Sequence, residues 1–151
     1  MRSDKRWFLS AIAGATGLVL LSGCLSTHPG SSSLAYVEVD TTDAKAIRAA
    51  ALRVFADDGY SLTSETGSGL EFEREATRHD QVLYGGVVGS RLVMRVVVSI
   101  EPQRKGGSLV RADAFTVRNG HADRLLRVGR RPYQSLLHHV RADLAKEGGA
   151  K

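Results

Sequence analysis

The side chains that most often carry chemistry are few in this chain of 151 residues, which has one cysteine, Cys24. The histidines are His28, His79, His121, His138 and His139. The adjacent pair His138 and His139 would point about 100° apart on a helix, so the two side chains could not readily share a zinc ion. No serine stands in the Gly-x-Ser-x-Gly frame of a hydrolase nucleophile elbow. We therefore expect no catalytic residue, no metal site, no cofactor and no enzyme.

The N-terminus has the three parts of an export signal. Met1–Arg6 is basic, Trp7–Leu21 is apolar and uncharged, and Ser22-Gly23 brings small residues up to Cys24. The apolar stretch is shorter than the roughly 20 residues that span a bilayer core. We therefore expect residues 1–23 to be a cleaved signal peptide rather than a permanent membrane anchor.

Leu21-Ser22-Gly23-Cys24 resembles the lipobox of bacterial lipoproteins, with an aliphatic residue, two small residues and a cysteine at the end of a signal peptide. The resemblance implies that Cys24 is diacylglycerylated, that the leader is cut just before it, and that its new amine is acylated. Two or three acyl chains on one residue hold a protein at a membrane, whereas a single chain binds only marginally. Lipidation also accounts for a lone thiol in an exported protein.

The residue after the lipobox cysteine is Leu25, not the aspartate that favours inner-membrane retention in enterobacterial lipoproteins. The resemblance therefore implies the inner leaflet of the outer membrane, with the domain facing the periplasm. Residues 24–33 consist of the lipidated cysteine and a tether rich in serine and turn-forming residues. The nine residues after Cys24 would span about 15–18 Å as a flexible chain, so the domain should work close to its membrane.

Composition limits the classes of partner. Hydrophobic residues make up 42% of the chain and charged residues 25%, which are ordinary values for a globular domain. Acidic side chains predominate over residues 24–80 and basic side chains over 81–151, a split typical of solvated faces that could also orient the domain over an anionic surface. Only 6% of residues are aromatic, and the leader predicts export, so we expect no nucleic-acid partner.

Hydrophobic periodicity predicts strands and helices over residues 34–147, with 148–151 as a disordered tail. Strands are expected over 35–40, 60–65, 70–76, 91–101 and 108–117, and helices over about 43–58 and 132–147. Thr41 or Thr42 is the expected N-cap of the first helix. Three glutamates alternate over 71–75 without an interleaved histidine or aspartate, which favours a solvated strand face over a metal site. We interpret 121–128 as a short helical piece.

The predicted fold class is α+β, an antiparallel sheet of about five strands with two helices packed on one face, in the order β-α-β-β-β-β-α. This element order is loosely similar to that of small α/β domains in envelope lipoproteins, including the helix-grip type in the lipoprotein C subunit of the β-barrel assembly machinery. We expect one domain and favour a monomer.

Residues 77–90 interrupt the strand pattern with an apolar, glycine-rich run. A buried strand with a glycine bend is the first interpretation, and a loop that contacts a partner is the second. The possible partner contacts there are Val82, Leu83, Tyr84, Val87 and Val88.

Arginines are densest at Arg124, Arg127, Arg130 and Arg131. If this segment is helical, Arg124, Arg127 and Arg131 share a face, since they are spaced by three and four residues. A solvated face is the default interpretation, and a contact for phospholipid or lipopolysaccharide phosphates is the alternative.

Two classes of function follow from these patterns. The first is a non-catalytic binding or scaffold module, held at the membrane through Cys24, that contacts an envelope protein or cell-wall polymer. The second is a small-ligand carrier or hydrolase with a pocket between sheet and helices and with His79 or His121 at its mouth.

Overall fold

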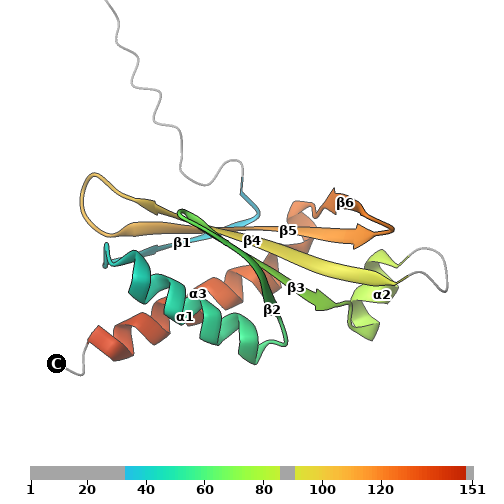
Figure 1. The fold of residues 1–151 in the computed structure, drawn as a ribbon, viewed down its shortest axis with the longest axis horizontal. Helices are drawn as coiled ribbons and strands as arrows, with labels where there is room; N and C mark the ends of the chain where they lie inside the picture. The colour runs from blue at the N-terminus through green and yellow to red at the C-terminus, as the bar shows by residue number, and fades with distance from the viewer. Residues whose placement is uncertain (1–32, 86–90, 149–151) are drawn as a thin grey trace, which may run out of the picture.

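An antiparallel sheet and two long helices on one of its faces form the two layers of the fold in the computed structural model, which describes residues 33–85 and 91–148 (Figure 1). The strands are β1 (Ala35–Val39), β2 (Ser61–Thr66), β3 (Gly69–Glu75), β4 (Leu92–Pro102), β5 (Ser108–Arg118) and β6 (His121–Arg124). The helices are α1 (Ala44–Asp57), α2 (Arg78–Tyr84), the short 3-10 turn η1 (Arg127–Gly129) and α3 (Arg130–Gly148). Helices α1 and α3 lie side by side under the sheet, and α2 lies at one end of it.

Five of the six strands are arranged in the order β1-β5-β4-β3-β2, and every pairing in the sheet is antiparallel. Strand β6 pairs with β5 on the edge that β1 also uses, so β1 and β6 follow one another along a single side of β5. The α+β class and the helix-covered sheet are confirmed. The structure adds one strand, β6, and one helix, α2, to the predicted order.

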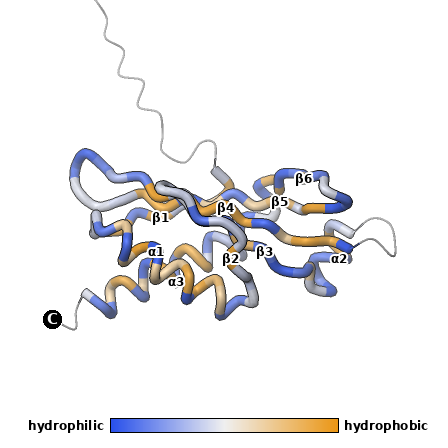
Figure 2. Tube along the Cα trace, viewed as in Figure 1, coloured by the Kyte–Doolittle hydropathy of each residue, from blue (hydrophilic) through white to orange (hydrophobic). Residues whose placement is uncertain are grey.

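The alternating residues of β3 and β4 and the apolar stripes of α1 and α3 meet in one core. Figure 2 shows hydrophobic residues along β4 and β5 and along both long helices. Phe55 of α1 stacks on Phe72 of β3 with ring centroids 4.6 Å apart, and Tyr60 meets the edge of Phe55 at 5.6 Å. Leu137 of α3 is fully buried in the same cluster. The predicted helix faces are therefore the ones that pack on the sheet.

Two local predictions are wrong. The N-cap of α1 is Asp43, whose carboxylate accepts hydrogen bonds from the backbone N–H groups of Lys45 and Ala46, while Thr41 binds the N–H of Asp43 itself. The predicted helical piece over 121–128 is instead β6 and part of η1. Asn119 and Gly120 both adopt positive φ, the conformation of a tight two-residue hairpin, and they turn the chain back so that His121 pairs with Arg118.

The face of the sheet opposite the long helices carries cross-strand ion pairs. Arg95 of β4 lies 3.1 Å from Glu71 and 2.6 Å from Glu73 of β3, and Arg111 of β5 lies 3.2 Å from Glu101 of β4. The glutamates of β3 are thus on the solvated side of the strand, as predicted, but arginines neutralise them.

A side chain of α3 closes part of the β1 edge. The amide nitrogen of Gln134 donates to the carbonyl of Tyr36 at 2.7 Å, and the amide oxygen of Gln134 accepts from the Tyr36 N–H at 3.4 Å. Gln134 therefore makes the two hydrogen bonds that a neighbouring strand would make with Tyr36.

The hairpin between β4 and β5 provides a test of close packing against β1. Gly106 and Gly107 both have positive φ, but a Cβ atom at Gly107 would lie 2.4 Å from the carbonyl oxygen of Val39, whereas one at Gly106 would meet nothing within 4 Å. We expect Gly106→Ala to lower the free energy of unfolding by about 1 kcal/mol and Gly107→Ala by about 2–4 kcal/mol, because only the second adds a backbone clash to the left-handed strain. Urea denaturation followed by circular dichroism measures both, and equal losses would contradict the close approach.

Candidate contact surface

The segment predicted as a buried strand begins with a surface helix, α2, and this corrects the first interpretation of residues 77–90. Thr77 is its N-cap: the Thr77 hydroxyl accepts from the N–H of Asp80, and the Asp80 carboxylate accepts from the N–H of Thr77 at 2.9 Å. This reciprocal capping box satisfies two backbone donors that the first turn would otherwise leave without partners. Local hydrogen bonding therefore starts a helix where apolarity alone indicated a strand.

A buried ion pair holds α2 against the sheet. Arg74 of β3 lies 3.1 Å from the carboxylate of Asp80, and both side chains are largely shielded from water. The guanidinium of Arg74 also lies 4.8 Å from the ring centre of Tyr60. Burial raises the pKa of Tyr60 and of Tyr133, so both phenols stay protonated and neutral beside the ion pair. A charge pair buried in this way fixes the helix, because separating it would leave an uncompensated charge.

The other end of α2 is also attached. Arg118 of β5 donates to the carbonyl of Tyr84 at 2.7 Å. A Cβ atom at position 129 would lie 2.8 Å from the Tyr84 hydroxyl, so Gly129 of η1 leaves the room that the tyrosine needs. With its N-terminus held by Arg74 and its C-terminus by Arg118, α2 has one defined orientation.

Two apolar side chains of this fixed helix are exposed, beside the exposed polar residues Arg78, His79 and Gln81. Val82 is 79% exposed and Leu83 is 56% exposed. Tyr84 is half-buried and packs against the core. These are three of the five predicted partner contacts, and the structure places all three on α2. Val87 and Val88 lie outside the described residues, as does Cys24.

The predicted arginine cluster is split over three elements, so the prediction that these arginines share one helical face is wrong. Arg124 is on β6 and lies 2.5 Å from Asp113 of β5, Arg127 is in η1, and Arg131 is in the first turn of α3. Because β6 is extended and not helical, residues three and four positions apart do not share one face there, as the prediction required. Arg127 and Arg131 are exposed.

The histidines are not gathered into one site. His79 on α2, His121 on β6, and His138 and His139 on α3 are all exposed, and His28 lies outside the described residues. Within residues 33–85 and 91–148, no three histidine, cysteine or acidic side chains are placed to hold a metal ion.

A surface hollow of about 630 Å³ lies beside the base of α2. Its lining is mixed in charge and hydroxyl-rich, and includes Glu73, Arg74, Glu75, Thr77 and Arg91. Arg91 pairs with Glu75 at 2.5 Å, Arg74 binds Asp80 and Glu73 binds Arg95, so most of the charges that line the hollow already have partners. This hollow is at the surface, whereas the predicted ligand pocket is between sheet and helices, where Phe55 and Phe72 stack.

Sequence reasoning missed the Arg74–Asp80 pair, although one signal was present. Thr77 followed three residues later by Asp80 is a capping-box spacing and could have indicated the helix. The pairing with Arg74 depends on how α2 folds back onto β3, which no spacing reports.

None of the helices in the described ranges combines the length and the apolarity needed to cross a bilayer. No protein-family model matches this chain, and no curated protein is similar enough to be called a relative.

Proposed function

We propose that this chain is a membrane-anchored envelope lipoprotein whose domain acts as a non-catalytic binding or scaffold module near the outer membrane. The leader and the lipobox support anchoring through Cys24. The observation that carries the binding role is α2, a helix held at both ends that presents Val82 and Leu83 to solvent.

The fixed position of α2 matters because an exposed apolar pair on a rigid element costs little ordering entropy when a partner covers it. Val82 and Leu83 favour a protein partner over a cell-wall polymer, since apolar side chains gain most when they enter an apolar recess. The partner proposed is therefore an envelope protein.

Acylation of Cys24 is the first prediction of the proposed function. Mass spectrometry of the protein purified from bacterial membranes should show a chain that begins at residue 24 and carries the mass of a diacylglyceryl group, with or without a further acyl chain. Cys24→Ala should leave the leader uncleaved by the lipoprotein peptidase. An intact Met1 or a free Cys24 thiol in the native protein would contradict the proposal that the chain is anchored through Cys24.

Contact through α2 is the second prediction. A photo-crosslinking residue placed at position 79, an exposed site on α2, should capture one dominant protein band in intact cells. The double variant Val82→Asp with Leu83→Asp should reduce that band at least about tenfold. The reason is that burying two charges in an apolar recess costs more than about 1.4 kcal/mol.

The control is Leu62→Asp, which places one carboxylate at a 41% exposed leucine on β2, away from α2. It should leave the band unchanged, and circular dichroism should show all variants folded. A crosslinked band that persists in the double variant would show that α2 is not the contact. A small molecule that leaves the protein only on denaturation would instead favour the ligand carrier.

A further inference from the structure

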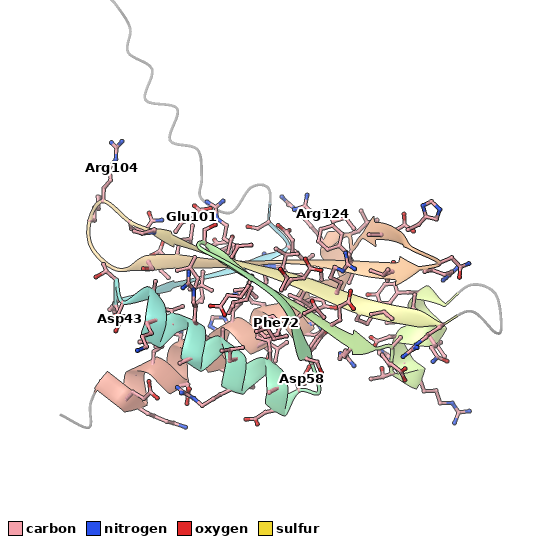
Figure 3. The ribbon with its side chains drawn as sticks, viewed as in Figure 1. Asp43, Asp58, Phe72, Glu101, Arg104 and Arg124 are labelled. Atoms are coloured by element: carbon pink, nitrogen blue, oxygen red, sulfur yellow. The ribbon has the colours of Figure 1, made fainter. Side chains whose placement is uncertain are left out.

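The first described residues are fixed at one place on the sheet. The N–H of Leu34 donates to the carboxylate of Asp113 at 2.9 Å, and the same carboxylate oxygen pairs with Arg124 of β6. The predicted tether therefore joins the domain directly beside the end of β6. Figure 3 shows Arg124 on the side of the sheet away from α1 and α3.

The following segment returns to the same place. Arg130, at the start of α3, lies 5.7 Å from the ring centre of Tyr36 and donates to Gln134, which in turn binds the Tyr36 backbone. Both ends of the segment 124–130 are thus connected to residues 34–36. The residues between those ends cannot lie far from the point where the tether begins, since six residues span at most about 20 Å.

This segment exposes an apolar side chain with basic neighbours. Leu125 is buried and its N–H donates to the carbonyl of Ala114, which leaves Leu126 pointing outward at 79% exposure. Arg127 and Arg131 are exposed beside it, and neither forms an ion pair with another described residue. The nearby acids are Asp113, which Arg124 neutralises, and the exposed Asp123 of β6. Positive charge therefore predominates.

We propose that Leu126, Arg127, Arg130 and Arg131, here called the anchor corner, rest on the anionic headgroups of the membrane that holds the lipid. Leu126 enters the interface and the arginines bind lipid phosphates. This inference rests on the proposed acylation of Cys24, because the nine residues between Cys24 and Leu34 span at most about 35 Å between the anchoring point and the domain. The lipid anchor then orients the domain as well as retaining it.

The test uses the mature protein purified from membranes and reconstituted in vesicles of phosphatidylcholine with or without phosphatidylglycerol. Since acylation blocks Cys24, Leu126→Cys and Leu62→Cys each provide one reactive thiol for a fluorescent label. A nitroxide carried on a lipid should quench the label at 126 and leave the label at 62, on the opposite sheet edge, unquenched. Quenching at 126 should be greater when phosphatidylglycerol is present.

Charge reversal completes the test. Arg127→Glu with Arg131→Glu should lower the equilibrium constant for docking on the anionic surface by at least about fivefold for each arginine lost. The control is Arg104→Glu with Lys105→Glu, the same change on the exposed tip of the β4–β5 hairpin, which Figure 3 places far from Arg124. Equal quenching at 126 and 62, or an equal response to both charge reversals, overturns the docking. Mass spectrometry of the same sample decides separately whether Cys24 is acylated, so failure of the anchor and failure of the docking remain distinct.

Discussion

Phe55→Ala should lower the free energy of unfolding by about 3–5 kcal/mol, the range for removing a large buried aromatic side chain. Phe55 is fully buried and contacts the rings of both Phe72 and Tyr60, so its loss removes ring contacts as well as apolar burial. It also joins α1 to the sheet, which leaves little freedom for the cavity to close. Urea denaturation followed by far-ultraviolet circular dichroism measures the change.

The control for Phe55→Ala is Leu62→Ala on β2, where the leucine is already partly in water. It should change the unfolding free energy by no more than about 0.5 kcal/mol. A negligible loss at Phe55 would show that α1 does not pack on β3 through this face.

Asp80→Ala should cost about 3–5 kcal/mol, because it removes one partner of a buried ion pair and leaves the charge of Arg74 uncompensated. It also removes half of the capping box of α2. Thermal and urea denaturation give the loss, and hydrogen exchange over residues 78–84 should show α2 opening before the rest of the domain.

Three comparisons isolate the effect of the buried charge. Thr77→Ala removes the cap alone and should cost about 1 kcal/mol. Glu75→Ala breaks the solvent-exposed pair with Arg91 and should cost less than about 1 kcal/mol. Adding Arg74→Met to Asp80→Ala should restore part of the stability, since the orphaned charge is then gone. If Asp80→Ala were no worse than Glu75→Ala, the ion pair would not hold α2.

Long elements with strong periodicity could be predicted from the sequence. The alternation of β4 and the stripe of α3 each repeat over enough residues that only one face of the element can enter the core. The five predicted strands and both long helices therefore lie where the pattern placed them. The strand order was not predictable, because β1 and β2 lie at opposite edges of the sheet through pairings that depend on distant residues.

Short elements were missed for a different reason. Strand β6 has four residues and α2 has seven, so neither contains enough periods for hydrophobicity to distinguish strand from helix. Their identities depend on turn and cap chemistry, the Asn119-Gly120 hairpin in one case and the Thr77 capping box in the other.

The candidate surface was predicted only in part. The apolar residues of α2 stand out in the sequence, and three of the five predicted contacts lie on it. What fixes them there does not stand out, because the Arg74–Asp80 pair depends on how α2 folds back onto β3, and Arg118 is 34 residues away from Tyr84 in the chain.

The side-chain amide of Gln134 also limits how copies of this domain could associate through the edges of their sheets. Successive residues of an edge strand turn their hydrogen-bonding groups alternately inward and outward, so β1 offers an incoming chain only Tyr36 and Glu38, and Gln134 already occupies Tyr36. At Glu38 the strand carries a charge, a common deterrent to edge-to-edge association. Growth of the sheet by a further strand is therefore disfavoured at β1, and at β2 a register shift between Leu62 and Ser64 interrupts a regular ladder. Neither β1 nor β2 therefore offers a continuous template for fibre formation.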